Sequence, residues 1–141
     1  MRLAALLVAL LALTACGSRH KTASPGEVVR AWSAALDRDD SEGAASLFAD
    51  GAQVIQSGVL TLKAHADAVR WNDALPCGGV ITLLEPRPNG QILAIFRLTG
   101  RPKHACDGPG DNAAAIFQVK NGKIVLWHEV PVPNLPSTQL A

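Results

Sequence analysis

The sequence contains no tyrosine, only three phenylalanines and three tryptophans, and one methionine in 141 residues. The missing tyrosine excludes any mechanism that needs a phenolic hydroxyl group. An excess of charge of either sign is also missing, because 13 basic residues face 12 acidic ones and the net charge is +1. Without a basic surplus to neutralise phosphates, no nucleic-acid partner is expected.

Hydrophobic residues, by contrast, make up 48% of the chain, and charged residues make up 18%. This composition is too apolar for a disordered chain, and the length suits one folded domain. Cysteine is scarce and odd in number, with three residues at positions 16, 77 and 106. The odd count requires that one cysteine has a role different from the other two.

The N-terminal residues have the pattern of an export signal. Arg2 supplies positive charge, and residues 3–13 form an apolar run shorter than the about 20 residues that span a bilayer. The run ends in Leu-Thr-Ala-Cys at residues 13–16, which resembles the lipobox of bacterial lipoproteins. An ordinary signal peptide and a buried N-terminal helix are the alternatives.

The resemblance to lipoproteins implies that residues 1–15 are a signal peptide, that the Cys16 thiol is lipidated, and that the new N-terminus is acylated, for example with palmitate. Several acyl chains anchor a protein far more firmly than one. The polar, small residues of the segment 16–24 then read as a flexible tether. We therefore expect an exported protein that Cys16 anchors to the bacterial cell membrane or envelope.

Two helices are predicted at the start of the folded part. Ser24 and Glu27 have the spacing of a capping box, and apolar residues then recur at helical spacing to about residue 38. Asp39 and Glu42 form a second capping pair, which predicts a short second helix that includes Phe48.

The remaining pattern predicts a short strand at 52–56, a third helix capped by Thr61 that ends before Pro76, and then strands only. After Pro76 the hydrophobic period changes from helical spacing to alternation, which is typical of strands. The strands are expected at residues 80–85, 91–99, 113–120 and 123–130.

This order predicts an α+β fold with three N-terminal helices on one face of a curved antiparallel sheet. The segments VVRAWSAALDRDDSEGAASLFAD and AIFQVKNGKIVLWHEVP resemble the opening helices and closing hairpin of the nuclear transport factor 2-like (NTF2-like) superfamily. That superfamily has a cystatin-like cone fold and includes SnoaL-like proteins and ketosteroid isomerase. The resemblance implies a domain at 25–131, an irregular tail at 132–141, and a pocket between the helices and the sheet. Ketosteroid isomerase activity is not implied, because its tyrosine has no counterpart here.

The turn at Asn121-Gly122 admits two strand registers. A two-residue turn pairs Lys120 with Lys123, whereas a three-residue loop with a bulge pairs Val119 with Lys123. We favour the bulge, because bulges bend strands and this family's sheet is strongly curved. The bulged register predicts an inner face of Ala115, Phe117, Val119, Val125, Trp127 and Glu129. It predicts an outer face of Ile124, Leu126 and His128, and the resemblance to the superfamily implies that a homodimer would form through this face.

The predicted pocket lining consists of Trp32, Ala115, Phe117, Val125, Trp127 and Glu129. Glu129 is the candidate acid or base, because a carboxyl beside an aromatic ring can have a raised pKa. A solvated carboxylate at a strand end is the alternative for Glu129, and a purely structural core residue is the alternative for Trp32.

Cys77 and Cys106 are predicted to form a disulfide, which an exported compartment permits. The alternative is a metal site made of His104, Cys106 and Asp107. No histidine pair has metal-ligand spacing, so neither a metal nor a cofactor is expected.

Three functions remain open from the sequence. The first is a non-catalytic envelope module that binds a small apolar molecule or a partner. The second is a small isomerase or hydrolase that uses a pocket carboxyl, and the third is a structural subunit that dimerises through its sheet.

Overall fold

The computed structural model describes residues 21–134. The predicted signal peptide, the lipidated Cys16 and the end of the tail lie outside the described residues. No helix among the described residues is long and apolar enough to cross a membrane.

The first two helices begin where capping residues allow. In α1 (Pro25–Asp37) the Ser24 hydroxyl accepts from the Glu27 backbone N–H, and the Glu27 carboxylate accepts from the Ser24 N–H at 2.6 Å. This reciprocal pair confirms the predicted capping box. In α2 (Ser41–Ser46) the cap is Asp40, whose carboxylate accepts from the Gly43 N–H at 2.8 Å. The predicted cap at Asp39 is wrong, because that carboxylate is used elsewhere in the fold.

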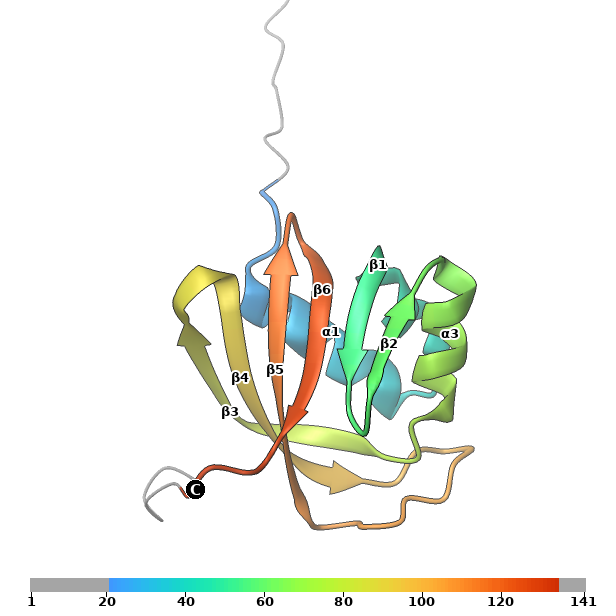
Figure 1. Ribbon diagram of the computed structural model, residues 1–141. Helices are drawn as coiled ribbons and strands as arrows, with labels where there is room; N and C mark the ends of the chain where they lie inside the picture. The colour runs from blue at the N-terminus through green and yellow to red at the C-terminus, as the bar shows by residue number, and fades with distance from the viewer. Residues whose placement is uncertain (1–20, 135–141) are drawn as a thin grey trace, which may run out of the picture.

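In the described part of the chain, six strands form one mixed sheet in the order β2-β1-β6-β5-β4-β3 (Figure 1). All neighbours are antiparallel except β1 and β6, which run parallel. Figure 1 shows β3 and β4 curling round the lower end of the molecule, and the register of β3 shifts between Ile81 and Leu83, as a bulge requires. The strands are β1 (Phe48–Ile55), β2 (Val59–Leu62), β3 (Gly78–Arg87), β4 (Gln91–Thr99), β5 (Asn112–Lys120) and β6 (Lys123–Val130), with a 3₁₀ turn, η1 (Pro88–Gly90), between β3 and β4.

The sequence prediction missed one strand and misplaced two boundaries. Phe48 begins β1 instead of ending a helix, and Thr61 lies in β2, an edge strand paired with β1. The third helix, α3 (His65–Ala74), therefore starts later than predicted, where the Asp67 carboxylate accepts from the Lys63 and Ala64 N–H groups. Residues 21–134 contain three α-helices, but a β-hairpin separates the first two from the third.

The closing hairpin contains both features that were treated as alternatives. Asn121 and Gly122 have φ values of 50° and 73° and form a two-residue turn that pairs Lys120 with Lys123, so the favoured three-residue loop is wrong. A bulge nevertheless follows, because Val119 pairs with Ile124 while Gln118 pairs with Leu126. Val125 is the extra residue of this bulge, and it brings Trp127 opposite Phe117.

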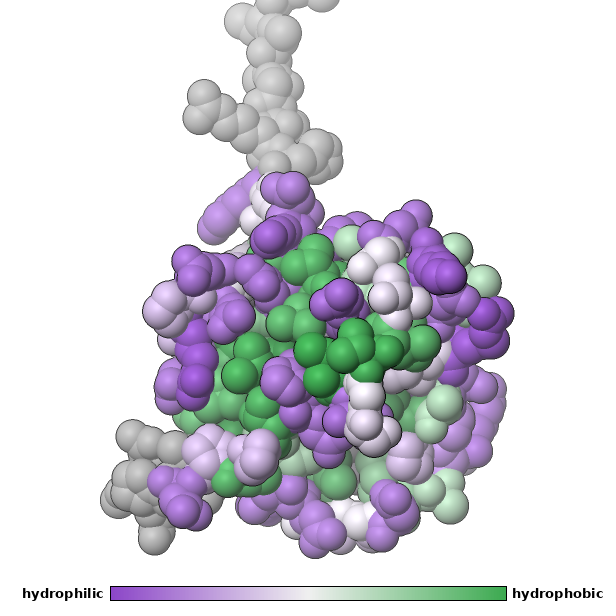
Figure 2. All heavy atoms as spheres, in the orientation of Figure 1, coloured by the Kyte–Doolittle hydropathy of each residue, from purple (hydrophilic) through white to green (hydrophobic). Residues whose placement is uncertain are grey.

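This bulge decides which side chains reach the core. Ile124 is fully buried with the inner-face residues, so its predicted place on the outer face is wrong. Leu93, Ile95 and Ala114 form a second cluster with partly buried Leu83, Ile116 and Val130. Figure 2 shows hydrophobic side chains gathered over the middle of the sheet face turned away from α1.

Helix α1 packs closely against the start of β3, and two hydrogen bonds join them. The Ser33 hydroxyl donates to the Gly79 carbonyl at 2.7 Å, and the Asp37 carboxylate accepts from the Gly79 N–H at 2.9 Å. A Cβ atom at Gly78 would lie 2.2 Å from the Asp37 Oδ1 atom. Glycine at position 78 therefore permits the approach of the helix to the strand.

A buried guanidinium joins the ends of the three helices. The Arg101 side chain is fully buried, and its Nε atom donates to Asp39 Oδ1 at 2.9 Å. Its terminal nitrogens donate to the carbonyls of Asn72 and Leu75 at the end of α3 and to the hydroxyl of Ser41 at the start of α2. The guanidinium thus supplies donors to carbonyls at the end of α3, where the Asn72 carbonyl also accepts from the Leu75 N–H.

Asp39 is the anion of this network. Burial opposes its ionisation, but the Lys103 N–H, the His104 ring and the Arg101 charge outweigh burial and hold the pKa of Asp39 below 3.8. Because the pKa of Asp39 is lowered on folding, its ionised form stabilises the fold above pH 3.8, and this contribution is lost as the pH falls through the folded-state pKa.

We predict that Asp39→Asn is less stable than the wild type at neutral pH, because Arg101 then lacks its anion. The difference in the free energy of unfolding should narrow as the pH falls below 3.8. Urea unfolding of both proteins across acid pH measures this difference. Asp50→Asn, at an exposed position, is the control and should stay close to wild type. A difference that is constant from neutral to acid pH would contradict the assignment.

Candidate functional site

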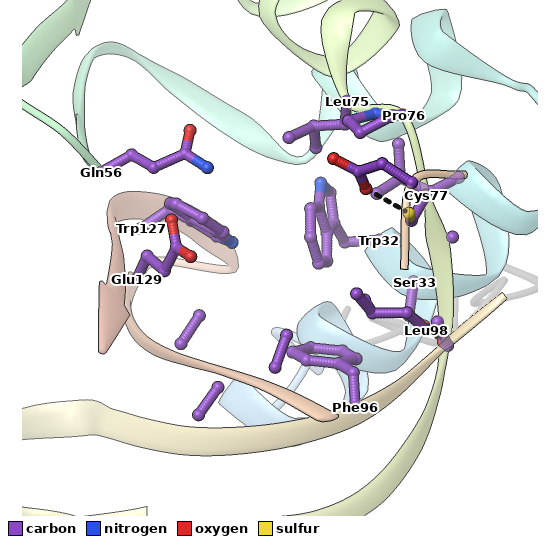
Figure 3. Close-up of a pocket in the computed structure, with 17 residues that line it drawn as sticks. Trp32, Ser33, Gln56, Leu75, Pro76, Cys77, Phe96, Leu98, Trp127 and Glu129 are labelled. Atoms are coloured by element: carbon purple, nitrogen blue, oxygen red, sulfur yellow. Dashed lines mark hydrogen bonds between the residues drawn. The ribbon is translucent and has the colours of Figure 1, made fainter. Parts of the chain in front are cut away.

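A cavity of about 240 Å³ lies between α1, the end of α3 and the inner face of the sheet (Figure 3). Its walls come from segments far apart in the sequence, because the bent parts of β3 and β4 bring the loop after β4 towards β6. The lining residues are Trp32, Ser33, Leu36, Gln56, Leu75, Pro76, Cys77, Gly78, Gly79, Phe96, Leu98, Asp107, Ala113, Ala114, Ala115, Trp127 and Glu129.

Aromatic rings form the deeper part of this cavity. The Trp32 ring packs edge-to-face against Phe96 and Phe117, with ring centroids 6.0 and 5.2 Å away. Its Nε1–H donates to the fully buried Asn72 Oδ1 atom at 2.8 Å, and the Asn72 amide donates to the Ala68 carbonyl. Trp32 is therefore both a core residue and a wall of the cavity, held in one orientation by a buried hydrogen bond.

Trp127 forms the opposite wall. Its side chain is 7% exposed, and its ring lies edge-to-face against Trp71 with centroids 5.1 Å apart. Figure 3 shows the ring nitrogen of Trp127 turned towards the cavity. Among the described residues, Trp127 Nε1 is the buried side-chain polar atom without a hydrogen-bond partner. An unpaired buried donor costs about 1 to 3 kcal/mol, so this N–H marks a place where a ligand can add stability.

The rim of the cavity is polar and acidic. Gln56, Asp107 and Glu129 are all exposed and lie around the opening, with Gln56 and Glu129 on the same side as Trp127 (Figure 3). None of the lining residues, all in the described part of the chain, is Lys, Arg or His. The site therefore offers an apolar interior and a rim that repels anions.

Four of the six residues predicted to line the pocket, Trp32, Ala115, Trp127 and Glu129, do line this cavity. Phe117 and Val125 do not. Phe117 is fully buried beneath Trp32 and Phe96, and Val125 is the extra residue of the β6 bulge.

Sequence reasoning missed Phe96, Gln56 and the Gly78-Gly79 pair as parts of the site. Phe96 had no usable signal, because residues 92–96 are all apolar and buried and no alternation marks the inner face of β4. Gln56 had none, because only the parallel pairing of β1 with β6 brings it beside Glu129.

Cys77 and Cys106 form a disulfide, which confirms that prediction. The alternative metal site is not assembled, because the Cys106 sulfur is bonded to Cys77 and the His104 Nδ1–H donates to Asp39 at 2.8 Å. Asp107 lies 3.4 Å from the Cys77 sulfur, the contact drawn in Figure 3. The disulfide therefore fixes the loop that carries Asp107 to the cavity wall.

We predict that Cys77→Ser/Cys106→Ser unfolds with a free energy lower by about 3 to 4 kcal/mol. The bond closes a loop with a sequence separation of 29, and its loss restores freedom to the unfolded chain. Thermal or urea unfolding measures the loss, and the wild type after reduction should show the same loss. Two alkylatable thiols in the unreduced, exported protein would contradict the disulfide.

No protein-family model and no curated protein matches the chain. Solved structures do match it. An NTF2-like protein of unknown function from Cytophaga hutchinsonii aligns with a TM-score of 0.63 at 12% identity, over 79% of this chain and 92% of its own. A protein from Sinorhizobium meliloti called a polyketide cyclase aligns with a TM-score of 0.60 at 17% identity, over 73% and 93% of the two chains.

A third structure has a bound small molecule. A protein with a ketosteroid isomerase-like fold from Catenulispora acidiphila, in complex with trimethylamine, aligns with a TM-score of 0.60 at 17% identity, over 84% of this chain and 94% of its own. Identities this low show a shared fold and leave the activity open. The fold of this chain is NTF2-like, as the resemblance of its sequence segments implied.

Proposed function

We propose that this protein is a lipid-anchored protein of the cell envelope whose NTF2-like domain binds a small, mostly apolar molecule without transforming it. The observation that carries the proposal is the cavity of about 240 Å³ between the helices and the sheet. Small-molecule sites are commonly apolar hollows with a few placed polar groups, and this cavity has that composition.

The chemistry of the walls supports an apolar and non-anionic ligand. Trp32, Phe96 and Trp127 supply apolar area, while Asp107 and Glu129 at the rim repel negative charge. The solved structures with this fold support a small-molecule role in general terms, since one holds trimethylamine and another is called a polyketide cyclase.

Binding is favoured over catalysis because both carboxylates at the cavity are exposed. A solvated carboxylate lacks the desolvation that tunes a general acid or base to neutral pH. An isomerase or hydrolase is the second candidate, since Glu129 and Asp107 both line the same cavity. That candidate requires turnover that Glu129→Gln abolishes while ligand binding remains.

The lipid anchor rests on the lipobox at residues 13–16, which lies outside the described residues. We predict that Cys16→Ala moves the protein from the membrane fraction to the soluble exported fraction, because a thiol is needed for lipidation. Fractionation with immunodetection, and labelling with a palmitate analogue, measure the change. Ser18→Ala in the adjacent tether is the control. Unchanged membrane retention of Cys16→Ala would refute lipidation as the anchor.

The cavity is tested with two ring compounds of similar size, cyclohexanone and cyclohexanecarboxylate. We predict that the neutral ketone binds the exported Cys16→Ala chain at least about tenfold more tightly than the anion, because the rim is acidic and a charge is costly to desolvate. Titrations followed by ¹H–¹⁵N NMR give both affinities.

Glu129→Gln should reduce the preference for cyclohexanone over cyclohexanecarboxylate, since the variant removes one of the two rim carboxylates. Absence of saturable binding of either compound, or binding that leaves every cavity-lining residue unshifted, would contradict the proposed function.

A further inference from the structure

Most buried side-chain donors in the cavity walls already form hydrogen bonds to other groups of the protein. Trp32 Nε1 donates to Asn72, and the Ser33 hydroxyl donates to the Gly79 carbonyl. Among the buried side chains of the described residues, Trp127 Nε1 is the donor left over. Because unpaired buried donors are rare in folded proteins, this one needs an explanation.

The Trp127 ring cannot readily turn to find a partner elsewhere. Its backbone is paired on both sides, to Phe117 of β5 and to Val54 of β1, and its ring packs against Trp71. The bulge at Val125 sets the face of the strand on which the ring lies. The direction of the N–H into the cavity is therefore fixed by the sheet (Figure 3).

The surroundings of this donor restrict what it can bind. Glu129 lies two residues further along the same strand face, and parallel pairing of β1 with β6 places Gln56 beside it. A carboxylate or phosphate of a ligand at Trp127 would lie close to the Glu129 charge, with no lining cation to offset the repulsion. The acceptor that suits this place is uncharged.

We infer that the ligand of this cavity is a small uncharged molecule that carries a carbonyl or similar acceptor oxygen, and that Trp127 Nε1–H is the donor that recognises this oxygen. The inference rests on the proposed function and adds to it the polar group of the ligand. Trp127 then selects for an oxygen that the aromatic walls alone would not distinguish from a methylene group.

Cyclohexanone and methylenecyclohexane test the inference, because they share a ring and differ in the acceptor. The three tryptophans give three indole N–H signals in a ¹H–¹⁵N spectrum of the exported Cys16→Ala chain. We expect the Trp127 signal to shift downfield with the ketone and not with the hydrocarbon. Trp127→Phe, made in that chain, should lower the ketone-to-hydrocarbon affinity ratio about five- to tenfold.

Val80→Ala, at an exposed position of β3 that does not line the cavity, is the control. Its affinity ratio should equal that of the parent chain. An unmoved Trp127 signal with bound ketone, as when a water molecule holds the N–H, overturns the inference but leaves the binding function standing. If neither compound binds, the proposed function itself fails. If Trp127→Phe does not fold, the test is whether cyclohexanone shifts the Trp127 indole N–H signal of the Cys16→Ala chain.

Discussion

The buried Arg101 guanidinium is the interaction on which the helical layer depends. It reaches Asp39 after α1, Ser41 in α2, and the last carbonyls of α3, so one side chain fixes the ends of three helices. Burying a charge is costly unless it is paired and fully hydrogen-bonded, and here the pairing is supplied by segments that are 60 or more residues apart in sequence. Once these ends are fixed, the α1 side chains that line the cavity, and Leu75 directly after α3, are also fixed.

The cavity exists because the backbone of β3 and β4 is bent. The shift in β3 and the curl of β3 and β4 bend the sheet, and Gly78 lets α1 approach the strand at the same end. The bent end leaves space between Trp32 on one side and Trp127 on the other (Figure 3). The Cys77–Cys106 disulfide then holds the loop after β4 against that space.

The apolar interior of the cavity and its charged groups lie in different places. Its aromatic interior is desolvated and holds one uncommitted donor, while its carboxylates lie at the exposed rim. This division is typical of a site that selects a ligand by shape and one polar contact.

Local signals in the sequence determined the first helix and the alternating strands, because capping and periodicity depend on near neighbours in the chain. The disulfide partners were predicted instead from the cysteine count, since two cysteines remain once Cys16 is set apart. The resemblance of the opening and closing segments also predicted the fold. Only the tertiary structure decided that Asp39 pairs with Arg101, that Thr61 lies in an edge strand, and that Val125 forms the bulge. These outcomes depend on partners distant in sequence, and a single inserted residue in a strand reverses the faces of all that follow. The sequence placed Glu129 and Trp127 on the inner face, but the unpaired Trp127 indole N–H that points into the cavity could be found only in the folded chain.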